Sequence, residues 1–138
     1  MAANDPTLYV RQAIVTRLKI DVSAVASRVY GRSPPAAPVW PFIRVAVDDV
    51  EPFTAQCLRG ATVNLTVHTF AKGDEDNAVA LLNRTVADAL SSKPLVLTDS
   101  PIPAELRRMQ WLRSQIIRDT DEATGWHGIV SFQGTVSS

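Results

Sequence analysis

The chain has 138 residues, of which 46% are hydrophobic and 20% are charged, and its formal net charge is zero. These values are typical of one globular domain that buries its own core. The balanced charge argues against a protein that wraps nucleic acid, because such proteins usually carry a marked basic excess.

A helix is the first predicted element. Asn4 or Asp5 can cap it, and Pro6 suits its first turn because the missing N–H would have no partner there anyway. Apolar residues then recur near helical spacing, at Leu8, Val10, Ala13, Ile14 and Leu18. A short helical turn within DVSAVASRVYG is expected to follow.

A proline-rich arm is predicted at residues 31–41, GRSPPAAPVWP. Its four prolines in eleven residues exclude a regular strand ladder, because proline has no N–H to donate. Yet Val39 and Trp40 are unusual in a disordered linker. We therefore expect an ordered, extended arm that lies on another surface.

Two strands with a long connection are predicted next. Apolar and polar residues alternate in FIRVAVD at 42–48 and again in ATVNLTVHTF at 61–70, as in half-buried strands. The inward positions are Ile43, Val45, Val47, Val63, Leu65 and Val67. Residues 49–60, DVEPFTAQCLRG, are predicted as a long hairpin loop, and such loops in compact domains are usually functional or mobile.

The strongest helical pattern is KGDEDNAVALLNRTVADALSSK, at residues 72–93. Three acidic residues, at 74–76, come where the positive end of the helix dipole favours anions. The apolar stripe at helical spacing consists of Val79, Leu82, Val86 and Leu90. Pro94 marks the end of this helix.

The last third of the chain predicts two strands joined by the turn TDEATG. HGIVSFQGTV at 127–136 alternates regularly and directs Val130, Phe132 and Val136 inward. LRRMQWLRSQIIRD at 106–119 has no single phase. This phase slip predicts a β-bulge, or a strand that buries both faces along its length.

The element order is helix, two strands, helix, two strands. It predicts an α+β fold: a mostly antiparallel four-stranded sheet with two main helices packed on one face. We expect one domain over residues 1–138, with the proline-rich arm at 31–41 and the long hairpin loop at 49–60.

RDTDEATGWHGIVSF, at 118–132, brings acidic residues, a histidine and a serine into a short span. We predict a hairpin turn that leads into a strand, and not an active site. His127 has the parity opposite to Val130 and Phe132, so it points away from the core. Ser131 lies too far along an extended strand to act with it as a nucleophile.

Other sites of chemistry have little support. His68 and His127, on different hairpins, could share a metal ion with Asp48 or Asp119, but no paired ligand spacing supports this. Cys57 could be a reactive thiol, although a cysteine at an interface suits its loop better. The sequence has no glycine-rich phosphate loop. We expect no enzyme activity, no cofactor and no metal.

Targeting signals and cysteine usage bear on localisation. MAANDPTLYVRQ has neither the basic nor the apolar region of a signal peptide, and no apolar run approaches the roughly 18 residues of a membrane span. The single cysteine excludes an intrachain disulfide. We expect a soluble protein that is made in a cytoplasm and does not bind a membrane.

Several features leave surplus apolar surface for so small a domain, which is typical of protein–protein contacts. They are the proline-rich arm, the loop at 49–60, the strand of ambiguous phase at 106–119 and the segment around Trp126. The candidate interface residues are Pro34, Pro35, Trp40, Phe53, Leu58, Arg59, Arg118, Asp119 and Trp126.

Three segments together resemble a known family. VASRVYGRSPPAAPVWPFIRV is similar to the small helix, proline-rich arm and first strand of phage tail completion proteins. TVNLTVHTFAKGDEDNAVALLNRTVADAL is similar to their second strand, glycine-containing loop and main helix. SQIIRDTDEATGWHGIVSFQGTV is similar to their closing hairpin. The order and spacing of these weak motifs, from about Leu8 to Val136, carry the resemblance.

The resemblance implies a tail terminator or tail-to-head joining protein of long-tailed phages and related particles. Such a protein would form a homo-oligomeric ring, a hexamer, on the head-proximal end of the tail tube. Its partners would be the tail tube protein and the connector or stopper of the head, with double-stranded DNA passing through. It would reside at the tail–neck junction of the virion, after assembly in the host cytoplasm. A neck adaptor or stopper protein is the alternative, and a small hydrolase using His68 or His127 is the rival class.

Overall fold

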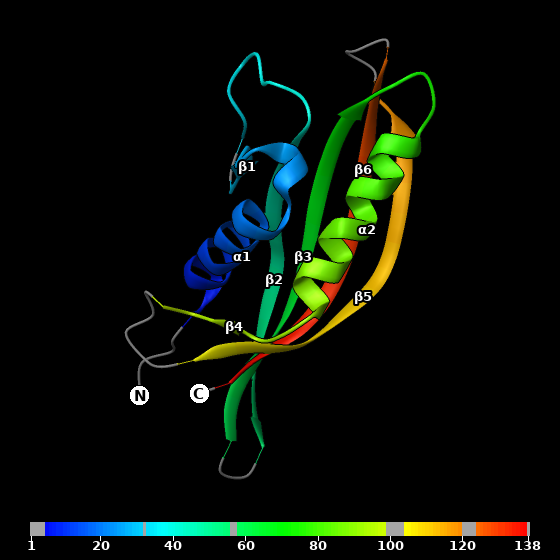
Figure 1. Cartoon of the computed structure of the whole chain (residues 1–138). Coiled ribbons are helices and arrows are strands. Elements are labelled where there is room, and N and C mark those ends of the chain that lie inside the picture. The colour runs from blue at the N-terminus through cyan, green and yellow to red at the C-terminus, as the bar shows by residue number, and fades with distance from the viewer. Residues whose placement is uncertain (1–4, 32, 56–57, 99–103, 120–123, 138) are drawn as a thin grey trace.

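The computed structural model describes residues 5–31, 33–55, 58–98, 104–119 and 124–137. Within these ranges the chain is an α+β domain with two long helices and one sheet of six strands (Figure 1). The helices are α1 (Thr7–Asp21) and α2 (Asn77–Ser91), with a 3-10 turn η1 (Ser23–Val25). The strands are β1 (Val29–Tyr30), β2 (Phe42–Ala55), β3 (Leu58–Lys72), β4 (Leu95–Val96), β5 (Glu105–Arg118) and β6 (Gly125–Ser137).

The sheet has the strand order β1-β2-β3-β6-β5-β4. The four long strands pair antiparallel, whereas β1 pairs parallel to β2, so the sheet is mixed. The prediction of a four-stranded sheet is therefore wrong in the number of strands. It missed β1 and β4 because two residues are too few to show an alternating pattern.

Both helices cover the same face of the sheet and enclose the core there (Figure 1). The buried side chains of α1 are Val10, Ile14 and Leu18, whereas Leu8 is 46% exposed, so the stripe does not include Leu8. The predicted stripe of α2 is buried as expected: Val79, Leu82, Val86 and Leu90. The long strands complete the core with Ile43, Val45, Val63, Leu65, Val67, Val130, Phe132 and Val136.

The predicted long loop at 49–60 is wrong. After a bulge between Val47 and Asp49, β2 continues to pair with β3 as far as Ala55 opposite Leu58. The hairpin projects beyond the rest of the sheet (Figure 1). Pro52 lies within this part of β2, and proline is tolerated there because β1 pairs with β2 only at Ile43 and Arg44.

The phase slip predicted in the fifth strand is a pair of bulges. The register of β5 against β6 shifts between Arg107 and Gln110 and again between Trp111 and Arg113. Arg108 takes a positive φ of 55° at the first of these shifts. The alternative, a strand that buries both faces, is wrong because most of β5 is exposed.

A buried polar pair ties α2 to the sheet. Thr69 Oγ1 donates to Asn83 Oδ1 over 2.5 Å, and both side chains are buried. Gly128 lies against this pair, where a Cβ would come within 2.1 Å of the Thr69 hydroxyl. Glycine is therefore required there by close approach. Neither described helix has the length and hydropathy needed to span a membrane.

Candidate interaction surface

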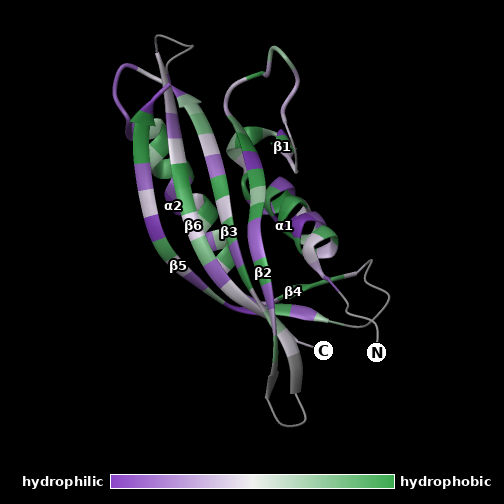
Figure 2. Cartoon of the chain, turned by 180° about the vertical axis from the view of Figure 1, so that it is seen from behind, coloured by the Kyte–Doolittle hydropathy of each residue, from purple (hydrophilic) through white to green (hydrophobic). Residues whose placement is uncertain are grey.

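The face of the sheet without helices, here called the open face, is seen from its own side in Figure 2. Between residues 62 and 70 of β3 and residues 127 and 135 of β6, its side chains carry no carboxylate, ammonium or guanidinium group, whereas Lys72 at the end of β3 lies over the Trp40 ring. They are Thr62, Asn64, Thr66, His68, Phe70, His127, Ile129, Ser131, Gln133 and Thr135. All are half-buried, so the middle of the open face is neutral and mostly polar.

Hydrogen bonds fix the polar part of the open face. Gln133 Nε2 donates to Asn64 Oδ1 over 3.0 Å, and Asn64 Nδ2 donates to Asp49 Oδ1 over 2.7 Å. Thr66 Oγ1 donates to the neighbouring carboxylate of Asp48. The network runs from β6 through β3 to β2, so it orients the acidic groups of β2 at one side of the sheet.

An aromatic cluster occupies one end of the open face. Phe70 stacks between Phe42 and His127, with ring centroids 4.5 Å and 4.4 Å away. Trp40 meets Phe42 and Phe70 edge-on, at 5.3 Å and 5.9 Å. Edge-on and offset-stacked geometries are the favourable ones for aromatic pairs. The tryptophan of the arm therefore packs on its own domain.

The rest of the arm follows this anchor. The peptide between Trp40 and Pro41 is cis, and Arg28 Nε donates to the Pro41 carbonyl over 2.9 Å. Pro34 is half-buried and Pro35 is exposed. The arm is thus ordered around Trp40 as predicted, and its contact with a further subunit stays a prediction.

Two histidines meet on the open face beside the aromatic cluster. His68 Nδ1 lies 2.9 Å from His127 Nε2, so one ring donates to the other. Burial, and then the charge of Arg44, lower the pKa of His68 to about 4 and lower the pKa of His127 as well. Asp48 and Asp119 oppose these shifts. Both rings are therefore neutral near pH 7, and they add no charge to the open face there.

The structure brings the two histidines together, but not the full metal site weighed from the sequence. Within the described ranges, no three side chains of the histidine, cysteine, aspartate or glutamate type are grouped to hold a metal ion. Cys57 lies outside the described residues. His127 faces away from the core, as predicted.

The two outer long strands present free edges. In the described chain, β1 covers β2 only at Ile43 and Arg44, and β4 covers β5 only at Glu105 and Leu106. Along the uncovered part of β5, three large apolar side chains are about half exposed: Trp111 at 58%, Leu112 at 54% and Ile117 at 48%. Apolar groups on an unpaired edge are unusual unless something binds them.

Three more of the predicted interface residues belong to the hairpin of β2 and β3. Phe53 is half-buried and lies across the hairpin from Gly60, whose added Cβ would be 2.8 Å from the phenyl ring. The side chains of Leu58 and Arg59 lie outside the described part of the chain.

Trp126 and its neighbours at the start of β6 interact within the domain. The Trp126 indole donates to the Gly73 carbonyl over 3.0 Å, and the Arg118 guanidinium lies 4.6 Å above its ring. Asp119 is half-buried, and its backbone N–H donates to the Gly125 carbonyl. A role of these residues at an interface stays a prediction.

The strand of ambiguous phase is among the surplus apolar features of the sequence, but its pattern does not identify the free edge of β5. The candidate interface residues predicted from the sequence do not include Arg107, Trp111, Leu112, Arg113 or Ile117. The signal that could have identified them is the phase slip itself, because bulges are common on edge strands.

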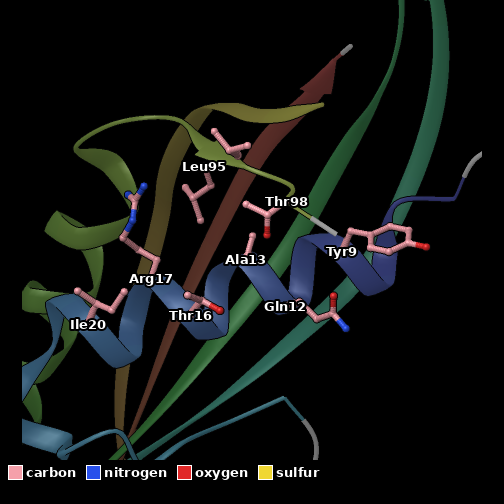
Figure 3. Close-up of a pocket in the computed structure, with 9 residues that line it drawn as sticks. Tyr9, Gln12, Ala13, Thr16, Arg17, Ile20, Leu95 and Thr98 are labelled. Atoms are coloured by element: carbon pink, nitrogen blue, oxygen red, sulfur yellow. The ribbon is translucent and has the colours of Figure 1, made fainter. Parts of the chain in front are cut away.

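A shallow pocket lies between α1 and β4 (Figure 3). Arg17 is the only ionisable cation in its lining, and its guanidinium donates to the carbonyls of Ala89 and Pro94, each over 3.1 Å. Arg17 therefore joins α1 to the end of α2, and its donors are used within the protein.

Comparisons with known proteins agree on one group. A family described as "Tail completion protein gp17" matches residues 12–137. A chain from a structure titled "Virion of native gene transfer agent (GTA) particle" superposes with a TM-score of 0.72 at 18% identity, covering 93% of this chain and 94% of the other. The gp17 protein of bacteriophage SPP1 superposes with a TM-score of 0.55 at 20% identity, covering 94% and 89%. No curated protein sequence matches the chain.

Proposed function

The chain belongs to the family of tail completion protein gp17, and from this membership we propose that it is a structural protein of a phage tail or related particle. In this proposal, about six copies form a closed ring at the head-proximal end of the tail tube. The ring ends growth of the tube and joins it to the connector of the head. The family match over residues 12–137 is the observation that carries the proposal.

The surface of the domain is consistent with such a ring. Cyclic closure requires two different, complementary surfaces on each copy, because every subunit binds one neighbour on each side. The β2 and β5 edges lie at opposite sides of the sheet, and the exposed Trp111 and Leu112 offer apolar area on one of them.

We place the open face toward the DNA channel. Residues 62–70 of β3 and 127–135 of β6 offer neutral side chains there, and the low pKa of His68 keeps that ring uncharged at neutral pH. Each cationic contact with a phosphate adds affinity by releasing counterions, so a neutral wall lets DNA slide without being held. The helices, on the other face, would then lie on the outside of the ring.

Deletion of the gene from the phage or particle genome that encodes the chain tests the proposal. We expect tubes of uncontrolled length and filled heads without tails, and a tagged chain should appear at the head-proximal ends of normal tails. Tails of normal length beside heads that lose DNA would instead indicate an adaptor or stopper. Intact, joined particles in the absence of the chain would contradict every version of the proposal.

The hydrolase alternative is tested separately by His68→Gln combined with His127→Gln. A structural ring should still assemble with this variant, because a structural role does not require a reaction at either histidine. An unchanged particle yield supports the structural role, whereas loss of a hydrolytic activity measured in the wild-type chain would support the enzyme.

A further inference from the structure

We propose that the free edge of β5 in one copy binds the free edge of β2 in a second copy, head to tail, so that the two sheets continue into one. The contact joins residues 107–113 of β5 to residues 46–51 of β2. The inference deepens the proposed ring, on which it rests, by naming the two surfaces that meet.

The two edges carry opposite charge. Residues 107–113 contain three arginines and no acidic residue, whereas residues 46–51 contain three acidic residues and no basic one. Arg108, Arg113, Asp48, Asp49 and Glu51 are all exposed. In the described part of the chain, Arg108, Arg113 and Glu51 form no ion pair. Complementary charge of this kind steers association and selects the partner surface.

The direction of the strands allows the sheet to continue. Pairing is antiparallel from β2 to β3, from β3 to β6 and from β6 to β5, so β2 and β5 run in opposite directions. Copies related by rotation about an axis along the strands keep these directions. The β5 strand of one copy therefore meets the β2 strand of the next in the antiparallel sense, as among the four long strands.

The pairing register aligns opposite charges on the open face. Glu51 pairs with Thr62, Thr62 with Thr135, and Thr135 with Arg107, so these residues form one row across the four long strands. If a second copy continues the sheet without a shift, its Glu51 lies beside Arg107 of the first. Arg107 also forms an ion pair with Glu105 over 2.8 Å, and its other guanidinium nitrogens remain available to a second carboxylate.

The same register aligns apolar groups on the helix side. Val47 pairs with Leu65, Leu65 with Phe132, and Phe132 with Trp111, which forms a second row. Without a shift, Trp111 of one copy lies beside Val47 of the next. The single aromatic side chain of β5 would then be covered by an apolar neighbour, while Arg107 meets Glu51 on the opposite face. Both faces of the junction are thus complementary in one register.

Charge reversal in the full chain tests the contact. We compare Arg107→Glu/Arg113→Glu on β5 with Asp49→Arg/Glu51→Arg on β2, and use Arg84→Glu on the exposed face of α2 as the matched control. Sedimentation velocity, together with NMR line widths, measures association up to about 1 mM, the weak end of the affinity scale. Each reversal should weaken association by about tenfold or more, as should high salt, and the control should not.

Mixing the two reversed variants in equal amounts restores opposite charge at both types of junction. We expect the mixture to associate nearly as well as the wild-type chain.

Register is tested in a Cys57→Ser background with Ala46→Cys and Arg113→Cys, which occupy one row. Oxidation should then give a ladder of linked copies. A wild-type chain that stays monomeric at 1 mM, or association unaffected by either reversal, overturns the proposal.

The edge contact and the proposed function can fail separately. The measurements above use the isolated chain and decide the contact alone. If the reversed variants still cap tails and join heads normally, the tail function stands and the edge contact is wrong. If the edges bind as expected but particles assemble without the chain, the contact stands and the tail function is wrong.

Discussion

His68 Nδ1 lies 2.9 Å from His127 Nε2 on the open face of the sheet. The pair joins strands that are far apart in the sequence, and it is shielded by stacking of His127 on Phe70 at 4.4 Å. One histidine can donate to the other only while the acceptor ring is unprotonated. The pair therefore couples the charge of the open face to pH.

The lowered pKa of His68, about 4, predicts acid sensitivity. Between that value and the usual pKa of about 6.5, the unfolded chain binds more protons than the folded one, so the free energy of unfolding falls as pH falls. Denaturant unfolding at several pH values, followed by circular dichroism, should show this loss. The His68→Gln/His127→Gln variant should lose less stability over the same window, and an equal loss would contradict the assignment.

Trp40 is expected to stabilise the isolated domain. Trp40→Ala removes its edge-on contacts with Phe42 and Phe70 and should lower the free energy of unfolding by about 2 kcal/mol, less than the roughly 3–5 kcal/mol of a fully buried aromatic. Val39→Ala, at a side chain that is 63% exposed, is the control and should change little. Loss of assembly with unchanged unfolding would instead assign Trp40 to a subunit contact.

Gly128→Ala is expected to separate α2 from the sheet. The added Cβ would lie 2.1 Å from Thr69 Oγ1 and 2.2 Å from Asn83 Oδ1, so the buried hydrogen bond must break or the helix must move. We expect the free energy of unfolding to fall by about 3 kcal/mol. Gly31→Ala is the control, because its nearest atom belongs to the flexible Arg11 side chain. Adding Asn83→Ala to Gly128→Ala should recover part of the lost stability. If the effects of the two substitutions simply add, the predicted clash between the Cβ and Asn83 is contradicted.

Three substitutions in the closing hairpin are expected to lower the free energy of unfolding by different amounts. Phe132 is 1% exposed in the core, so Phe132→Ala should cost about 3–5 kcal/mol. Trp126→Ala loses one hydrogen bond and a cation–π contact and should cost less, while His127→Ala should cost least. Urea unfolding of the three variants measures the order. A larger cost at His127 than at Phe132 would contradict the placement of the core.

A positive charge on the open face should slow DNA passage if that face lines the channel. Ser131→Lys adds an ammonium group between Thr66 of β3 and Arg113 of β5, where it can hold a phosphate. We expect assembled particles with slower DNA ejection, relieved by added salt. Ala80→Lys, on the exposed side of α2, carries the same charge and should have no effect. Equal DNA ejection rates for both variants would contradict the proposal that the open face lines the channel.

Periodicity alone determined much of this fold. Alternation at Val63, Leu65 and Val67 identified the helix-facing side of β3, and the spacing from Val79 to Leu90 identified the buried face of α2. These patterns are reliable because a strand or helix presents one face to the core with a fixed repeat. The three resembling segments also indicated the family that the match over residues 12–137 confirms.

Tertiary structure decided which surfaces those elements form together. The contacts of His68 with His127 and of Trp40 with Phe70, and the row that links Glu51 to Arg107, depend on strand order and register. Local periodicity fixes which face a side chain takes, but not which distant strand lies beside it. For the same reason β1 and β4 had no sequence signal, since their two residues are strands only through the neighbours that they pair with.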